Sequence, residues 1–314
     1  MGINPLIIAA PIIGGAYFGD AISPLSDSTN VAAGTVGIDL FDSIKYQAIT
    51  TLPAALICGV IYFMMGRNVD YSMADITVIN EVVKGIDSSY KLGIIPLIPM
   101  VVVLIMLLKK VPSIPSILSG SISGFLVAWL YQGQSFKNVV QSMWGGFVLN
   151  SDNAFIKQIF SRGGITSMSG TAFLFVFAFG LFGILNTAGI IDKVVEPLTK
   201  KVKGRLGGTI CTVILGFISN ITSASGNFSF VFTGSLMTPV YEKANLSKWD
   251  LTRAMSVGCL LSGLLVPWNS NPLTVTGFLG VDTIDMLPYM FTPLVTAAVL
   301  FVVTGLNLDK KFKK

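Results

Sequence analysis

The feature that most constrains this chain is a series of apolar stretches, each close to the length that a helix needs to cross a bilayer. A spanning helix takes about 20 mostly apolar residues, and five stretches approach that length without a charged side chain. They are residues 47–66, 92–108, 114–131, 171–190 and 287–306. Hydrocarbon leaves backbone polar groups without water, so segments of this length cross it as helices. The sequence therefore predicts an all-α polytopic membrane protein.

The composition agrees with this class and excludes several others. Only 12% of the 314 residues are charged and 52% are hydrophobic, whereas a soluble domain carries about a quarter charged residues. This excludes a disordered chain, and it leaves too little polar surface for a nucleic-acid partner. The sequence has no histidine, and its three cysteines lie in apolar stretches. We therefore expect no cofactor and no enzymatic activity, and a lipid bilayer as the surrounding partner.

Three further apolar regions are interrupted by small polar residues, glycine and proline. They are residues 3–34, 207–241 and 254–280. Irregular backbone at membrane depth is tolerated only where it is buried in protein or lines a cavity. Broken segments of this kind are the best sequence indication of a transport site. A fourth stretch, 135–160, mixes aromatic and polar residues and is expected to be interfacial.

The first interruption contains two carboxylates, Asp20 and Asp27. Pro24 lacks an amide hydrogen and disfavours helix at the residue before it, which is expected to leave backbone carbonyls free. Oxygen-bearing side chains surround the two aspartates: Ser23, Ser26, Thr29 and Asn30. Such a set of hard oxygens suits a small cation such as Na⁺. The alternative is that Asp20 and Asp27 cap helices in a water-exposed turn.

The second and third interruptions are uncharged and predict a site for a substrate. The second supplies Asn220, Thr222, Ser223, Ser225 and Asn227, and the third supplies Trp268, Asn269 and Asn271, bracketed by Pro267 and Pro272. Hydroxyls, amides and helix ends bind a cation or a carboxylate. The alternatives are helix packing through small residues for the second interruption, and an interfacial anchor for Trp268.

Lysine and arginine positions predict the sidedness. Basic residues favour the cytoplasmic side, and they cluster at 109–110, at 193–205 and in the tail 310–314. These clusters fit a multi-pass protein of the cell membrane with a cytoplasmic C-terminal tail, provided that 207–241 forms a hairpin turning near 219–227. A single tilted helix over 207–241 is the alternative. No signal peptide or linker is visible, so a single membrane domain over residues 1–314 is expected.

At three places the residues resemble the NhaC family of Na⁺/H⁺ antiporters, which includes malate/lactate antiporters. The first is Gly15-Ala16-Tyr17-Phe18-Gly19-Asp20 with Ser23-Pro24-Leu25-Ser26-Asp27-Ser28-Thr29-Asn30. The second is Gly163-Gly164-Ile165-Thr166-Ser167-Met168. The third is Leu251-Thr252-Arg253-Ala254, followed by Leu265-Val266-Pro267-Trp268-Asn269.

The resemblance implies a cation-coupled secondary transporter with broken helices, re-entrant hairpins and inverted repeats. It assigns Na⁺/H⁺ coupling to six residues of the first motif, with Asn269 as a later candidate. The six are Asp20, Ser23, Ser26, Asp27, Thr29 and Asn30. Family members are longer, so the resemblance also implies that a group of N-terminal helices is missing and the inverted repeat incomplete. The chain departs from the family in having no carboxylate soon after Arg253, and Asn186 where a glutamate is frequent.

Three functional hypotheses follow. The first is an antiporter that exchanges Na⁺ for H⁺ or for a small organic acid, because a proton and a cation exclude each other on one carboxylate. The second is a Na⁺-coupled importer of an amino acid or carboxylate. The third is a non-transporting fragment that needs a partner chain. The oligomeric state stays open, with a dimer among the states allowed.

Overall fold

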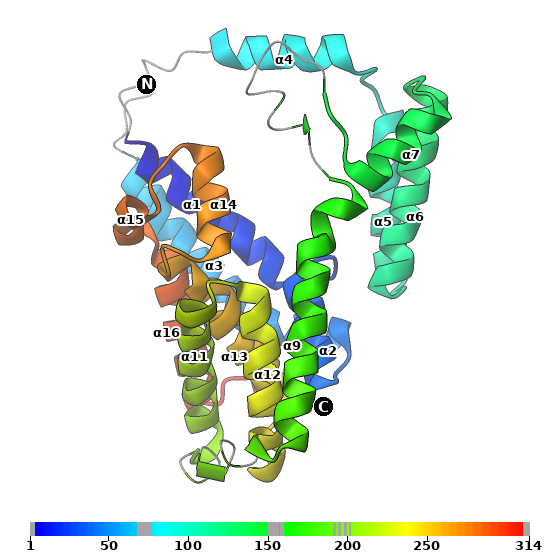
Figure 1. The fold of residues 1–314 in the computed structure, drawn as a ribbon. Coiled ribbons are helices and arrows are strands. Elements are labelled where there is room, and N and C mark those ends of the chain that lie inside the picture. Colours follow the sequence, from blue (N-terminus) through cyan, green and yellow to red (C-terminus); the bar gives the residue numbers. More distant parts are fainter. Residues whose placement is uncertain are drawn as a thin grey trace. The chain divides into compact units, whose positions relative to one another are not determined.

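The computed structural model consists of helices joined by turns (Figure 1). It describes residues 4–67, 77–149, 163–190 and 202–309, together with Lys157, Phe160, Ser161, Lys193, Glu196, Pro197 and Lys200. Within these residues every regular element is a helix, which confirms the all-α fold class. The chain divides into two compact units, residues 71–173 and residues 2–70 with 174–314. The single domain over 1–314 stays a prediction.

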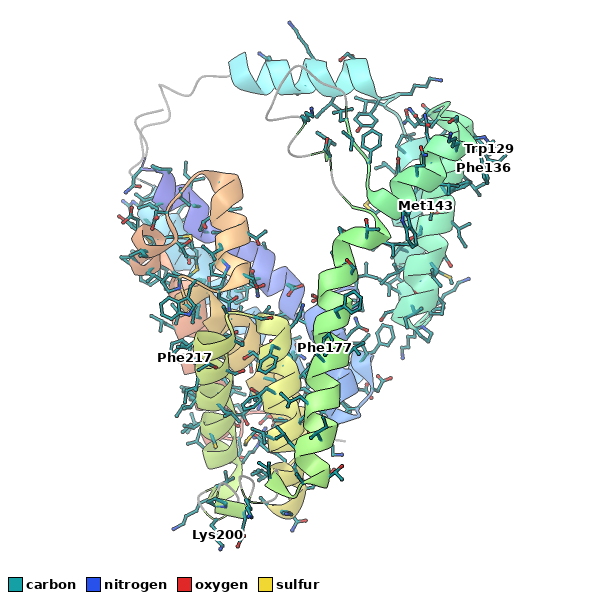
Figure 2. The ribbon with its side chains drawn as sticks, viewed as in Figure 1. Trp129, Phe136, Met143, Phe177, Lys200 and Phe217 are labelled. Carbon is teal, nitrogen blue, oxygen red and sulfur yellow. The ribbon has the colours of Figure 1, made fainter. Side chains whose placement is uncertain are left out.

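The smaller unit is built around a pair of apolar helices. Its elements are α4 (Thr77–Ser89), η1 (Ile95–Leu97), α5 (Ile98–Leu108), α6 (Ser113–Leu126), the π-helical turn η2 (Val127–Tyr131), α7 (Phe136–Gly145) and η3 (Ile165–Met168). Gly120 lets α5 and α6 cross closely, because a Cβ there would lie 2.3 Å from Val103. At one end of the pair the rings of Trp129 and Phe136 pack edge to face, with centroids 5.7 Å apart (Figure 2).

The larger unit begins with three helices. They are α1 (Pro5–Ala21), α2 (Asp27–Val36) and α3 (Leu40–Gly66). The sequence sets two of the starts, because the side chains of Asn4 and Asp39 accept hydrogen bonds from the amides of Leu6 and Asp42. The helix α9 (Ser169–Thr187) leads from the smaller unit into the larger one.

The remaining helices of the larger unit contain the second and third interruptions. They are α11 (Gly204–Ser223), α12 (Gly226–Lys243), α13 (Lys248–Met255), α14 (Ser270–Leu279), α15 (Thr283–Met286), η6 (Leu287–Tyr289) and α16 (Phe291–Gly305). Two turns continue α13 without a break, the π-helical η4 (Ser256–Leu260) and the 3₁₀-helical η5 (Leu261–Leu265).

The hairpin predicted over 207–241 is confirmed. Ala224 has the left-handed conformation (φ 55°) that ends α11, and Ser225 caps the start of α12. The two helices then run back along each other, since Gly208 near the start of α11 lies against Tyr241 in the last turn of α12 and Leu246 just after it.

The segment from α13 to η5 is the centre of the larger unit. Its residues 250–264 are all buried, and Leu251, Met255 and Leu260 pack with Phe230 and Tyr241 of α12 in the main core. The π-helical turn lies against α11 at very short range, because a Cβ on Gly216 would lie 2.5 Å from the carbonyl oxygen of Gly258. Two glycines therefore permit this crossing.

The predicted spans agree with the helices in part. Three helices, α3, α6 with η2, and α11, are long and apolar enough to cross a membrane, and two bent pairs of helices add up to two more. They carry apolar side chains on their outer surface, such as Leu56 and Phe63 of α3. The expectation for 92–108 is wrong in length. Its helix starts only at Ile95, after Gly93 with φ 149°, and remains a shorter apolar helix.

Candidate functional site

The first interruption is a short turn between α1 and α2. The amides of Ile22 and Ser23 bond to the carbonyls of Gly19 and Asp20, and α2 starts at Asp27 with Ser26 as its N-cap. Asp20 thus lies in the last turn of α1 and Asp27 in the first turn of α2, where the helix dipole favours a negative charge.

The carbonyl oxygens in this turn are not free, which corrects the expectation that Pro24 would leave them unpaired. The Thr29 hydroxyl donates to the carbonyls of Ser23 (2.5 Å) and Ser26 (3.1 Å). The Asn30 amide donates to the carbonyls of Pro24 (2.9 Å) and Ser26 (2.7 Å). Ser23 accepts from the Leu25 amide. Side chains of α2 therefore take the place of the missing helical donors.

The two carboxylates are linked through Ser28 and Asn227. The Ser28 hydroxyl donates to Oδ2 of Asp20 at 2.9 Å, and the Ser28 backbone amide donates to Oδ1 of Asp27 at 2.9 Å. Oδ2 of Asp27 accepts from the side-chain amide of Asn227, on α12, at 3.2 Å. The second interruption thus contacts the first directly. Asp20 is half-buried and the Asp27 side chain is exposed.

The second and third interruptions are joined by backbone and side-chain bonds. The Ser270 amide donates to the Ala224 carbonyl (2.9 Å), and the Trp268 indole donates to the Ile221 carbonyl (2.9 Å). The Asn269 side-chain amide donates to Oδ1 of Asn220 (3.0 Å). The two interruptions therefore form one connected structure.

Asn220 is the centre of this connection. It is fully buried, and its amide donates to the carbonyls of Gly258 and Cys259 and to the Ser262 hydroxyl. These acceptors belong to the π-helical turn and the residues after it. A π-helical turn offers carbonyls whose α-helical partners are displaced, and such turns often occur at functional sites.

A pocket of about 340 Å³ lies where the interruptions meet. Polar groups of all three interruptions line it together with apolar side chains of α1, α12 and η4. The lining residues are Ala16, Tyr17, Asp20, Asp27, Ser28, Gly226, Asn227, Phe230, Leu260 and Asn271.

Four predicted site residues line this pocket: Asp20, Asp27, Asn227 and Asn271. Other predicted residues lie behind it as supports. Ser26, Thr29 and Asn30 hold the α1–α2 turn, and Asn220 and Asn269 join the interruptions.

The remaining predicted residues have local roles. The hydroxyls of Thr222 and Ser223 donate to carbonyls of their own helix, Ser225 caps α12, and Trp268 is exposed. Pro272 does not interrupt the chain as expected, because it lies in the first turn of α14, where a missing amide hydrogen costs nothing.

Sequence reasoning missed Ser28, although it lies between two residues that were selected. The motif is rich in hydroxyls, and nothing in the sequence distinguishes Ser28 from Ser26 or Thr29. The helical start at Asp27 places Ser28 toward Asp20, and that orientation is visible only in the structure.

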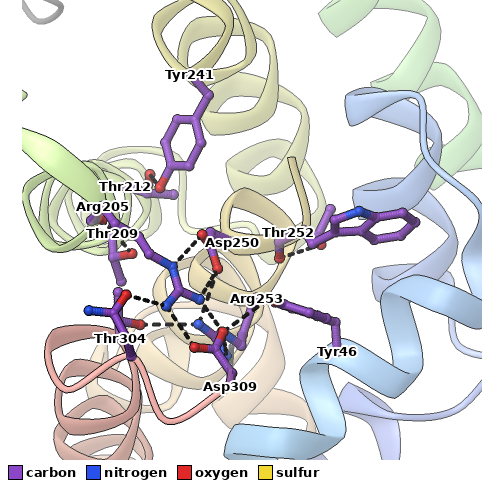
Figure 3. A network of polar contacts seen from close by, with 12 residues as sticks. Tyr46, Arg205, Thr209, Thr212, Tyr241, Asp250, Thr252, Arg253, Thr304 and Asp309 are labelled. Atoms are coloured by element: carbon purple, nitrogen blue, oxygen red, sulfur yellow. Dashed lines mark hydrogen bonds and ion pairs between the residues drawn. The ribbon is translucent and has the colours of Figure 1, made fainter. Parts of the chain in front are cut away.

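A second polar centre lies at the opposite end of α11, about 20 Å from Asn220 along the helix. Arg205 binds Asp250 with two hydrogen bonds of 2.6 Å and also pairs with Asp309 (Figure 3). Arg253 pairs with the same two carboxylates, and its guanidinium lies 5.0 Å from the centre of the Tyr46 ring. The half-buried Arg205 and the buried Arg253 thus balance two buried aspartates.

This ionic cluster was also missed. The only local indication was that Asp250 and Arg253 are three residues apart, a spacing that brings side chains together on a helix. The partners Arg205 and Asp309 come from distant segments, and nothing in their local sequence indicates the pairing.

The smaller unit has its own, larger pocket of about 1340 Å³. It lies among α4, α6, α7 and the segments that follow α7, with Asp87, Phe125, Asn138 and Met143 among its lining residues. None of the predicted site residues lines it.

Comparison with known proteins identifies the family. A model of the Na⁺/H⁺ antiporter family matches residues 15–306. The Na⁺/H⁺ antiporter NhaC of Alkalihalophilus pseudofirmus is 32% identical, over 99% of this chain and 68% of that protein. The malate-2H⁺/Na⁺-lactate antiporter of Bacillus subtilis is 29% identical, over 97% of this chain and 66% of that protein.

A more distant relative is named for a different activity. The arginine/ornithine antiporter ArcD of Halobacterium salinarum is 26% identical, over 100% of this chain and 65% of that protein. The chain thus spans about two thirds of the length of these curated relatives. No solved structure matches it. Since the family model covers most of its residues, the chain belongs to the Na⁺/H⁺ antiporter family.

Proposed function

We propose that this chain performs cation-coupled secondary transport across the cell membrane, exchanging Na⁺ for H⁺. The observation that carries the proposal is the shared pocket: Asp20 and Asp27 line it together with Asn227 and Asn271. Carboxylates within a membrane protein are costly, and they are associated with ion and proton pathways. Relatives in this family are antiporters of Na⁺ and H⁺ by name.

The chemistry of the pocket suits competition between Na⁺ and H⁺. Two carboxylates attract a cation, and neighbouring hydroxyl and amide oxygens supply further hard ligands. Protonation removes the charge that attracts the cation, so the two ions displace each other. Because the pocket lies where helices are interrupted, small movements of their ends can change access to it.

Proteoliposomes test this function. The purified protein should dissipate a preset pH gradient when Na⁺ is added, and Asp27→Asn should abolish the effect. The control is Asp42→Asn, since Asp42 is exposed and pairs only with Lys45 among the ion pairs of the described residues. Equal Na⁺-dependent activity in both variants would refute the assignment of Asp27.

A second candidate function is exchange of Na⁺ for a small organic acid or amino acid. Two observations favour it. The pocket, at about 340 Å³, has the size of a small-molecule site, and the first turns of α2, α12 and α14 all supply lining residues. Helix N-termini attract carboxylates. Under this alternative, pH changes would depend on adding the solute, such as malate or lactate.

We also propose that the ionic cluster faces the cytoplasm. The start of α11 lies against the end of α12, and Asp309 pairs with Arg205 at this same end. Lys203, Lys243 and Lys248 are close in sequence to these segments, and cytoplasmic ends are rich in lysine and arginine. A reporter that is active only in the periplasm should be inactive when fused to the C-terminus. Activity of that fusion would reverse the orientation.

A further inference from the structure

We propose that Ser28 is a positioning residue that holds Asp20 ready for the transported cation while fixing Asp27 beside it. This inference rests on the proposed function, because it concerns the same pocket. Ser28 lines the pocket and is only 3% exposed. Its hydroxyl and its backbone amide bind one carboxylate each, with both distances at 2.9 Å.

The Ser28 hydroxyl is part of a short chain of polar groups. It lies 2.7 Å from the Ser26 hydroxyl, and Ser26 is the N-cap residue of α2. The chain Ser26–Ser28–Asp20 therefore connects the start of α2 with the last turn of α1. No other hydrogen bond to the Asp20 side chain is found among the described residues, so Ser28 alone orients this carboxylate there.

Two carboxylates in one pocket repel each other, and free rotation would let them turn apart. The Ser28 hydroxyl prevents this rotation of Asp20 without adding another charge to the pocket. It is also adaptable, because a hydroxyl both donates and accepts. When Na⁺ enters, the Ser28 oxygen can turn a lone pair toward the ion while Asp20 stays in place. Preorganisation of this kind improves affinity by reducing the ordering that binding requires.

Three substitutions separate hydrogen bonding from packing. Ser28→Ala removes the hydroxyl, Ser28→Cys keeps nearly the same shape with a weak donor, and Ser28→Thr keeps the hydroxyl. The backbone amide that binds Asp27 is unchanged in all three. Ser121→Ala is the matched control, because the exposed Ser121 hydroxyl donates to a carbonyl of its own helix, that of Ile117.

The measurements are equilibrium binding of ²²Na⁺ to the purified protein, and the KM for Na⁺ and the maximal rate in proteoliposomes. We expect Ser28→Ala and Ser28→Cys to raise both Kd and KM about tenfold, within the range for loss of a hydrogen bond to a charged group. The maximal rate should change less than threefold. Ser28→Thr and Ser121→Ala should stay near wild type.

Wild-type Na⁺ affinity in Ser28→Cys would overturn the inference, since only packing is then required at this position. Wild-type affinity in Ser28→Ala would overturn it as well. If Ser28→Thr fails to fold, the Na⁺ affinities of Ser28→Cys and Ser28→Ala still test the inference. Wild-type protein that binds Na⁺ without exchanging it would refute the proposed function alone, whereas normal exchange with unaffected Ser28 variants would refute only the role of Ser28.

Discussion

The side-chain amide of Asn227 donates a hydrogen bond to the carboxylate of Asp27 at 3.2 Å, although 200 residues separate them in the sequence. This contact links the α1–α2 turn with the tip of the hairpin formed by α11 and α12. Through Asn271, which lines the same pocket, the third interruption takes part as well. Three segments that are apart in sequence thus contribute to one site.

Asn227→Ala is expected to weaken Na⁺ binding moderately. The variant removes one of the two amide hydrogen bonds that orient Asp27, so we predict a rise of about threefold to tenfold in the Na⁺ concentration that gives the half-maximal rate. Thr222→Val is the control, because its exposed hydroxyl bonds to carbonyls of its own helix. The role of Asn227 would be contradicted if this Na⁺ concentration were unchanged in Asn227→Ala, or if it rose equally in Thr222→Val.

Asn220→Leu should destabilise the fold. The side chain is fully buried, and its amide satisfies two carbonyls and the Ser262 hydroxyl. Leucine removes these hydrogen bonds and leaves the buried Asn269 amide without its acceptor, at a cost of about 2–3 kcal/mol. The loss should appear as a lower midpoint of thermal unfolding in detergent, and an unchanged midpoint would show that Asn220 does not join the interruptions.

Gly216→Val should destabilise the fold more than the same substitution at a glycine with open space around it. A Cβ at Gly216 would lie 2.5 Å from the Gly258 carbonyl oxygen, so α11 would have to move away from the π-helical turn. We expect a loss of stability of about 2 kcal/mol or more. Gly59→Val in α3 is the control, because a Cβ there meets nothing within 4 Å. Equal losses of stability in both variants would argue against the close crossing of α11 and the π-helical turn.

Part of this architecture followed from the sequence. The apolar stretches predicted the helices. Small polar residues, glycine and proline within apolar regions predicted the three interruptions. Asp20 and Asp27 were identifiable because carboxylates are rare in such a chain. Their pairing with Asn227 was not, since it depends on how distant helix ends pack.

Other features could not be predicted, because they depend on contacts that form only when the helices pack together. The oxygens near Pro24 looked free, but Thr29 and Asn30 of the next helix bond to them. The same limit applies to the ionic cluster, because Asp309 and Arg205 are 104 residues apart and meet only in the folded chain.

The ionic cluster predicts how stability depends on pH. Burial disfavours the ionised form of Asp309, but hydrogen bonding to Arg205 and the charges of Arg253 and Arg205 prevail and lower its pKa from 3.8 to about 2. A carboxylate whose pKa is lowered by folding stabilises the fold at pH values above its unfolded pKa. This contribution, about 2 kcal/mol, is lost as the pH falls from about 4 to about 2.

Asp309→Asn tests this dependence. The variant should be less stable than wild type at pH 6, since Arg205 and Arg253 lose part of their compensation. Its unfolding temperature should also change less than that of wild type between pH 5 and pH 2. Parallel pH profiles for the two proteins would show that Asp309 does not titrate as the cluster requires.

The most direct test of the account is equilibrium binding of ²²Na⁺ to the purified protein and to the double variant Asp20→Asn/Asp27→Asn. The account predicts saturable binding in wild type and in Asp42→Asn, and none in the double variant at the same Na⁺ concentrations. Saturable binding with unchanged affinity in a correctly folded double variant would contradict the claim that these two aspartates hold the transported cation.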